Sequence, residues 1–210
     1  MAEHANHRAD TAQPVARSPL SATPRSGPDP HSAAVCITER DPVGQLVLRG
    51  DPDESGFASR AAGVLGFDLP LKANTATRDG ARRAIWMGPK EWLIVSPPQR
   101  TEGLQTKLQY RLRRHHAAVV DVSHSRVIFG LSGAEARQVL CKGCAIDLHP
   151  RVFGPGQCVQ TRLARCHMLL HQLDDAPGYD IYIHRSFARY AWAWLLDAGS
   201  EYGIAASRWV

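Results

Sequence analysis

The chain has 210 residues, of which 44% are hydrophobic and 21% are charged, and its formal net charge is +5. This composition excludes a wholly disordered chain, and no stretch approaches the roughly 18 unbroken apolar residues of a membrane helix, so we expect no membrane contact. The positive charge allows an acidic partner but does not by itself indicate nucleic acid.

The first 32 residues are rich in Pro, Ala, Ser and Arg and nearly lack large apolar side chains. Such a segment cannot bury enough surface to offset its ordering entropy, so residues 1–32 are predicted to be a disordered tail. An arm that orders on a partner is the alternative. The segment also lacks the apolar centre of a secretory signal, which favours a cytoplasmic location.

The first half of the remaining chain alternates strands and helices. A helix is predicted over residues 53–66, with an acidic first turn and a glycine at its end. A second is predicted over 101–116, where Leu104, Leu108 and Leu112 repeat every four residues. The predicted strands are residues 33–40, 44–50, 82–88 and 91–97.

The stretch "WMGPKEWLIVSPP", residues 86–98, predicts a hairpin whose loop contains Gly88, Pro89 and Lys90. Trp92 begins its second strand, and a double proline ends that strand. We expect Lys90 and Glu91 to be solvated residues of the turn, because a lone exposed ion pair contributes little.

The second half repeats the same order of elements. A helix is predicted over 133–143, with Gly143 as its left-handed cap, and another over 186–199, with Ser186 as its N-cap. The predicted strands are residues 117–125, 126–133, 157–173 and 179–185, with "DDAPG" as the turn before the last of them. The predicted core face of the last helix comprises Phe187, Tyr190, Ala191, Trp194 and Leu195.

The two halves resemble each other, and the Asp-Leu pairs at Asp68 and Asp147 lie at corresponding places. We therefore predict an α+β fold of two pseudo-repeated halves, each a mixed or antiparallel sheet covered by helices. The predicted boundaries are a tail at 1–32, halves at 33–116 and 117–205, and a C-terminal tail at 206–210.

Five cysteines and no export signal favour reduced thiols. Cys141 and Cys144 have the spacing of a redox pair or of half a zinc site, but the sequence contains no second CxxC. The alternative is that both residues pack at a helix end.

Familiar catalytic signatures are missing from the sequence. It contains no GxGxxG, GxxxxGK[ST] or GxSxG, and Pro155 disrupts the nearest phosphate-type loop. Asp121, Ser123 and His124 are close in sequence, but on a strand His124 points away from the other two, so they cannot form a triad among themselves. The basic run at 110–116 lacks the interleaved aromatics and glycines of RNA-binding modules.

Three segments carry a resemblance to a known family. They are "MGPKEWLIV", the region from Val119 to Gln172 that includes "LSGAEARQVLCKGCAIDLHP", and "YDIYIHRSFARYAWAWLLDAG". Together they resemble the gamma subunit of heterotetrameric sarcosine oxidase, and the similarity runs from about residue 35 to 205. That family is similar in fold to the folate-binding aminomethyltransferase of the glycine cleavage system.

The resemblance implies a non-catalytic assembly subunit that works with alpha, beta and delta subunits. It implies an oxidative demethylation of sarcosine that yields glycine, hydrogen peroxide and methylenetetrahydrofolate. It places FAD and FMN in beta, NAD and tetrahydrofolate in alpha and zinc in delta, with no cofactor, metal or catalytic residue in this chain. The alternative is a stand-alone folate-binding protein of the same fold.

A non-catalytic subunit acts through contacts, which a few aromatic and arginine anchors dominate. The candidate interface residues are Trp92, Arg189 and Trp192. For Trp192 a place in the chain's own core is an equal alternative, because the last helix carries large aromatics on opposite sides.

Overall fold

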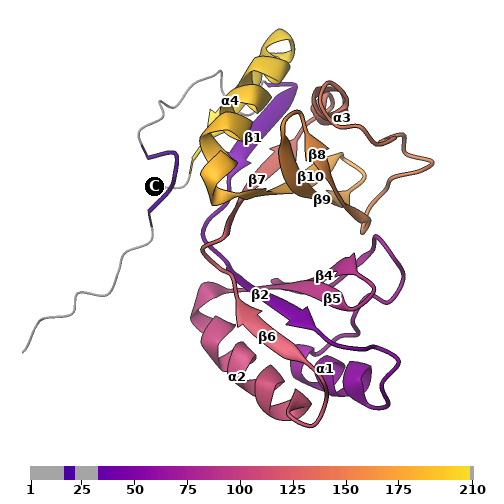
Figure 1. Cartoon of the computed structure of the whole chain (residues 1–210). Coiled ribbons are helices and arrows are strands. Elements are labelled where there is room, and N and C mark those ends of the chain that lie inside the picture. Colours follow the sequence, from indigo (N-terminus) through magenta and orange to yellow (C-terminus); the bar gives the residue numbers. More distant parts are fainter. Residues whose placement is uncertain (1–16, 22–32, 209–210) are drawn as a thin grey trace, which may run out of the picture.

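The computed structural model describes residues 17–21 and 33–208, and these residues form an α+β fold of four layers. Two sheets face each other, and each carries its helices on the outer side (Figure 1). Helices α1 (Phe57–Leu65) and α2 (Thr101–Leu112) cover one sheet. Helices α3 (Ala136–Cys141) and α4 (Ala188–Gly199) cover the other.

The first sheet is antiparallel throughout and has five strands. In spatial order they are β3 (Ala76–Asp79), β4 (Arg82–Gly88), β5 (Glu91–Ser96), β2 (Gly44–Arg49) and β6 (Ala118–Asp121). β4 and β5 form the predicted hairpin, and the short helix η1 (Pro98–Arg100) follows the double proline.

The second sheet is mixed and has six strands. In spatial order they are β11 (Ile204–Ser207), β1 (Val35–Glu39), β7 (Arg126–Ser132), β10 (Gly178–His184), β9 (Cys166–Asp174) and β8 (Cys158–Leu163). Only the β1–β11 pair is parallel.

The two chain halves exchange their first strands. β1 pairs with β7 in the sheet that the second half builds, and β6 pairs with β2 in the sheet that the first half builds. The chain therefore crosses between the layers twice, through residues 40–43 and 122–125 (Figure 1). A division at residue 116 consequently separates chain segments but cuts through both sheets.

The internal repeat is visible in the strand orders β6-β2-β5-β4-β3 and β1-β7-β10-β9-β8. The helix η2 (Arg185–Phe187) leads into α4 as η1 leads into α2. Leu69 and Leu148, the second members of the two Asp-Leu pairs, are buried in the two outer cores. The α+β prediction with two pseudo-repeated halves is confirmed, while the strand exchange is a feature that no local pattern indicated.

Three apolar clusters hold the layers together. One lies between α1, α2 and their sheet, and includes the predicted Leu104, Leu108 and Leu112. A second lies under α3 and α4. The third joins the two sheets and comprises Ile85, Met87, Leu93, Val95, Ile128, Cys158, Leu169 and Tyr182.

Several predicted helix ends were wrong. α1 begins after Gly56 with no acidic residue in its first turn, although it ends at a left-handed Gly66 as predicted. Gly143 is not left-handed; a Cβ there would lie 2.4 Å from the Trp194 ring, so close packing and not a cap requires the glycine. Ser186 lies within η2, and α4 has Phe187 at its N-cap position with no side-chain cap.

The core face of α4 is rotated from the predicted one. Phe187 and Tyr190 are 47% and 38% exposed, while Trp192 is 1% exposed and Trp194 packs partly against the core. The buried residues of the helix are Ala188, Ala191, Trp192, Leu195, Ala198 and Gly199.

Part of the predicted N-terminal tail is packed on the fold. Leu20 is fully buried in the core under α4, whereas residues 1–16 and 22–32 lie outside the described residues. At the other end, residues 206 and 207 belong to β11 and not to a tail, and 209–210 lie outside the described residues. No helix among the described residues is long and apolar enough to cross a membrane.

Candidate functional site

Two of the three predicted interface residues lie inside the chain. Trp92 is fully buried, donates from Nε1 to the Pro70 carbonyl oxygen at 2.8 Å and packs against Phe57. Trp192 packs edge-on against Phe129, with ring centroids 5.3 Å apart. Neither indole presents its ring to a partner surface, because each lies between a sheet and the helices that cover it.

Arg189 remains at the surface, on the outer side of α4. Its Nε donates to the Pro19 carbonyl oxygen at 3.1 Å. Phe187, the last residue of η2, and Tyr190 of α4 lie close to Arg189 in sequence and are exposed, so the start of α4 presents a cation and two aromatic rings at the surface. We call Phe187, Arg189 and Tyr190 the α4 surface.

The docked segment 17–21 lies beside the α4 surface and is held by arginines. The guanidiniums of Arg185, Arg189 and Arg208 donate to the backbone carbonyl oxygens of Arg17, Pro19 and Leu20, respectively. Ser18 Oγ donates to the buried Glu39 carboxylate at 2.7 Å. Burial raises the pKa of Glu39, and the Ser18 hydrogen bond opposes that rise.

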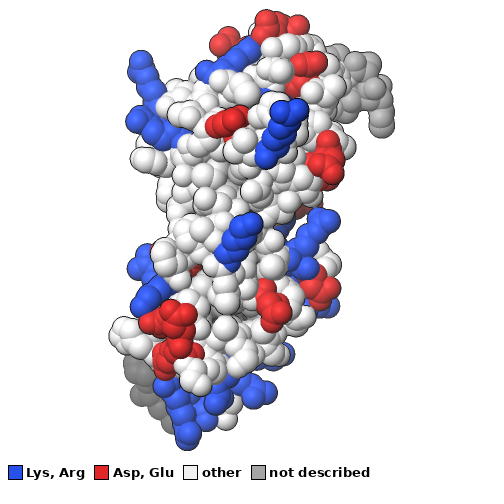
Figure 2. All heavy atoms as spheres, turned by 90° about the vertical axis from the view of Figure 1, so that its right-hand side faces the viewer, with Lys and Arg blue, Asp and Glu red and all other residues white. Residues whose placement is uncertain are grey.

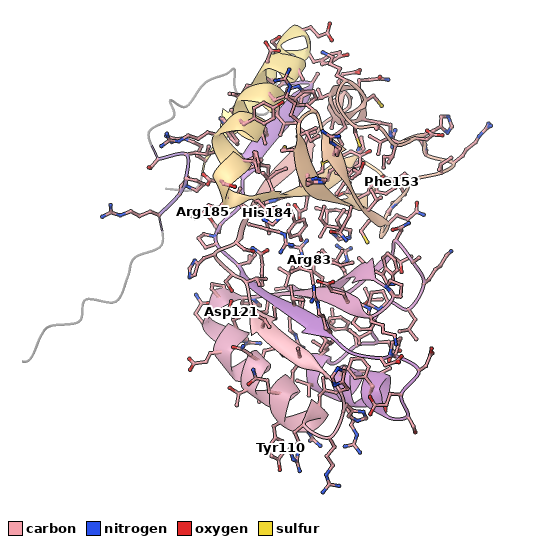
Figure 3. All side chains as sticks on the ribbon, viewed as in Figure 1. Arg83, Tyr110, Asp121, Phe153, His184 and Arg185 are labelled. Atoms are coloured by element: carbon pink, nitrogen blue, oxygen red, sulfur yellow. The ribbon has the colours of Figure 1, made fainter. Side chains whose placement is uncertain are left out.

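A charged cluster joins the two sheets on their inner faces. Asp180 on β10 is 1% exposed and accepts from Arg83 Nη1 on β4 at 2.7 Å. Arg40, just after β1, donates from Nε to the same carboxylate at 3.1 Å. Figure 3 shows Arg83 in the space between the layers.

Next to this cluster lie buried polar groups from the same inner face. His171 is 3% exposed, and burial followed by the charge of Arg83 lowers its pKa to about 4. Cys158 is buried, and desolvation raises its thiol pKa to about 12. A buried imidazole of such low basicity is a weak general base, and a buried protonated thiol is a poor nucleophile.

The CxxC pair is divided between surface and interior. Cys141 is exposed at the end of α3, whereas Cys144 is buried and forms a β-bridge with Leu163. Burial raises the pKa of the Cys144 thiol. Among residues 17–21 and 33–208, no group of three or more His, Cys, Asp or Glu side chains could hold a metal ion.

The polar residues singled out in turns make local contacts. The Asp121 carboxylate accepts from the backbone N–H and the hydroxyl of Ser123, at 2.8 and 2.6 Å. Lys90 Nζ donates to the Asp51 carboxylate at 2.6 Å, and Arg49 Nη2 donates to Glu91 at 3.2 Å. The hairpin turn is therefore connected to Arg49 at the end of β2 and to Asp51 just after it. These hydrogen bonds account for the polar side chains in the turns, and no catalytic role is needed to explain them.

Among the described residues, three cavities of at least about 400 Å³ lie around the inner faces of the sheets. One of about 400 Å³ lies between segment 17–21 and the two crossing segments, another of about 410 Å³ adjoins Asp180, and a third of about 460 Å³ lies over the ends of β7–β10. Arginine side chains line all three: Arg40 and Arg126 the first, Arg83 the second and Arg126 the third.

Charges of both signs are interspersed on the face shown in Figure 2. A group of basic side chains lies at the lower end of this view, but no continuous basic stripe crosses the face. Nucleic-acid-binding proteins carry such a stripe to follow the phosphate backbone.

Comparison with known proteins gave consistent results. The model of a protein family described as "Sarcosine oxidase, gamma subunit family" matches residues 49–201. A sarcosine oxidase subunit gamma of Corynebacterium sp. (strain U-96) is 34% identical over 173 residues, 82% of either chain. One from Arthrobacter sp. is 33% identical and covers 81% of this chain and 83% of its own.

Solved structures agree with these matches. A chain of heterotetrameric sarcosine oxidase from Corynebacterium sp. U-96, in complex with pyrrole 2-carboxylate, superposes with a TM-score of 0.78 and 31% identity. The superposition covers 90% of this chain and 97% of that one. Glycine cleavage system aminomethyltransferase T from Bartonella henselae gives a TM-score of 0.60 at 15% identity, over 83% of this chain and 48% of the other, and shows the same fold.

Proposed function

Since the chain belongs to the sarcosine oxidase gamma subunit family, we propose that it acts by assembly, as a non-catalytic subunit of a heterotetrameric sarcosine oxidase. The observation that supports this proposal most is the superposition on a chain of such an enzyme, which covers 97% of that chain. In this proposal alpha, beta and delta subunits are the partners, and the complex is cytoplasmic.

The proposed reaction of the complex is oxidative demethylation of sarcosine to glycine, with hydrogen peroxide and methylenetetrahydrofolate as the other products. We place the flavins, NAD, tetrahydrofolate and zinc in the partner subunits. The burial of His171 and Cys158 supports a role without chemistry for this chain, because the imidazole is inaccessible and weakly basic and the thiol stays protonated. Folate binding by this chain alone is not proposed, since the likeness to the aminomethyltransferase concerns the fold.

The α4 surface is the contact site that we propose. Exposed aromatics beside an arginine are the side chains that dominate protein interfaces. Phe187 and Tyr190 are the exposed large apolar residues of this part of the chain, and Arg189 lies between them in sequence.

The test is a pull-down of alpha, beta and delta subunits with the tagged chain. Arg189→Ala should weaken association by about 2 kcal/mol and lower the melting transition only slightly, because Arg185 and Arg208 still hold segment 17–21. Trp192→Ala should instead lower the stability of the chain itself by about 3–5 kcal/mol, because its ring is in the core. Arg151→Ala, in an exposed loop, is the control.

If Arg189→Ala assembles as well as the control, the α4 surface is not the contact site. If the unmodified chain captures no sarcosine oxidase subunit, the assembly function itself is contradicted.

A further inference from the structure

One rung of the larger sheet consists only of basic side chains. Arg126 on β7 pairs with His184 on β10, and His167 on β9 pairs with Arg162 on β8. β10 and β9 are themselves neighbours, with Ile183 opposite Met168, so the two pairs lie one after the other across four adjacent strands. We call Arg126, His184, His167 and Arg162 the basic row.

The basic row lies on the face of the six-stranded sheet that is directed toward the five-stranded sheet. Side chains alternate between the faces of a strand, and the next residues on that face, Ile128, Tyr182 and Leu169, belong to the cluster between the sheets. Figure 3 shows His184 at the end of β10, beside the space between the layers. The row therefore continues the inner face beyond the part that the five-stranded sheet covers.

A cavity of about 460 Å³ lies over this row. Its lining includes all four basic residues together with Gln160, Thr161 and Tyr182, and among the described residues that line it none is acidic. Gln160 Nε2 donates to the Met87 carbonyl oxygen at 2.6 Å and ties the inner edge of the cavity to the other sheet.

The basic row has no carboxylate partner among the described residues. Glu91 acts electrostatically on Arg126, but Arg49 Nη2 already donates to both of its oxygens at 3.2 Å. Like charges opposite each other on neighbouring strands destabilise a sheet. A bound anion would supply the counter-charge that the basic row lacks.

The pKa of His184 is shifted in the direction expected for a row without a counter-charge. Burial, and then the charges of Arg126 and His167, lower the pKa of His184. An anion above the row would reverse the electrostatic part of that shift and favour the protonated imidazole.

We propose that the basic row binds a small polyanion, a molecule that carries two or more phosphate or carboxylate groups. Four strands span about 14 Å at the usual strand spacing, which suits several linked anionic groups better than one. Arginines at both ends offer forked donors, and the two histidines between them add charge when protonated. This site is separate from the α4 surface and from the assembly function.

The test is calorimetric titration of the full chain with inorganic tripolyphosphate and, in a second arm, with citrate. We expect saturable binding of at least one probe, at least about threefold tighter at about pH 6 than at about pH 8, because an anion above the row favours the protonated imidazole of His184. The probe that binds more tightly identifies phosphate or carboxylate as the preferred group.

The double variant Arg162→Gln and His167→Gln should weaken that binding by at least about tenfold. Both side chains are exposed, so the fold should persist, which near-ultraviolet circular dichroism checks. The matched control removes the same residue types elsewhere, as Arg111→Gln with His116→Gln, where both side chains are also exposed.

Two results would overturn the proposal: no binding of either probe at about millimolar concentration, or equal weakening in the control variant, which would indicate a general charge effect. If neither probe binds but the row variant fails to assemble, the occupant is an acidic segment of a partner subunit and not a small molecule. Failure of assembly in the unmodified chain concerns the proposed function and leaves the titration result unaffected.

Discussion

At the scale of single residues, Asp180 is a buried carboxylate that requires ion-pair partners. It lies in the middle of an apolar strand, is 1% exposed and accepts hydrogen bonds from the guanidiniums of Arg83 on β4 and of Arg40 in the crossing segment. A buried carboxylate is tolerated when it is paired, and removal of the pair leaves charges without compensation. Asp180 therefore links the stability of the sheet interface to one ion cluster.

Asp180→Asn should lower the free energy of unfolding by about 3 kcal/mol, because Arg83 loses its counter-charge in a mostly buried place. Arg40 is 44% exposed and can be solvated, which limits the loss. Urea denaturation measures the change. Asp51→Asn, which breaks the exposed pair with Lys90, is the comparison and should leave the midpoint nearly unchanged. Equal effects of the two substitutions would contradict the role assigned to the cluster.

His171 should make the chain sensitive to acid. Its folded pKa of about 4 lies below the usual 6.5, so the unfolded state binds the proton first as the pH falls. Stability is therefore complete above about pH 6.5 and is lost as the pH falls toward 4, by at most about 3 kcal/mol. The groups that act on it are Arg83, Asp180 and Arg78.

The measurement is the free energy of unfolding of the chain and of His171→Gln between about pH 7 and about pH 4.5. The variant should lose less stability over this interval, because the titrating group is gone. Parallel pH profiles would show that acid sensitivity comes from other residues.

At the scale of elements, two glycines differ in the space that their surroundings leave for a side chain. Gly143, at the end of α3, is in close contact with Trp194 of α4, whereas a methyl group added at Gly103 within α2 would point into open space. The same substitution should therefore have opposite effects at the two positions.

Gly143→Ala should destabilise the chain by about 1–3 kcal/mol, because the new methyl group overlaps the indole ring. Gly103→Ala should stabilise it by up to about 1 kcal/mol, since alanine is the better helix former. Thermal unfolding of both variants checks the signs. A neutral Gly143→Ala would mean that α3 and α4 can move apart at no cost.

At the scale of the whole molecule, the exchanged strands make the two halves interdependent. β1 requires β7 and β11 from the second half, while β6 completes the sheet of the first. The cluster between the sheets adds contacts from β4 and β5 to β7–β10. We expect the fold to melt as one cooperative unit.

Fragments of residues 33–116 and 117–208 should therefore be largely unfolded when separate and should recover structure when mixed. Circular dichroism and sedimentation of each fragment and of the mixture measure this. A stable, monomeric fragment 33–116 would show instead that the first half folds without β6, and that the strand exchange is dispensable.

The sequence alone determined the local elements, because periodicity acts over a few residues. Leu104, Leu108 and Leu112 predicted the buried face of α2, the Gly-Pro turn predicted the β4–β5 hairpin, and repeated order predicted two similar halves. A similar signal was available for Asp180, since a lone acid in the apolar strand "YDIYIH" indicates a buried partner, but it could not name Arg83.

The tertiary structure alone decided which elements meet. Pairing of β1 with β7, burial of Trp92 and Trp192, the docking of Leu20 and the alignment of the basic row all depend on contacts between residues far apart in the chain. Local patterns carry no information about such partners, because a strand or helix shows the same periodicity whichever surface covers it. The orientation of α4 illustrates this, because its aromatic residues lie on several faces of the helix. Packing of α4 on the sheet places Trp192 in the core, against Phe129.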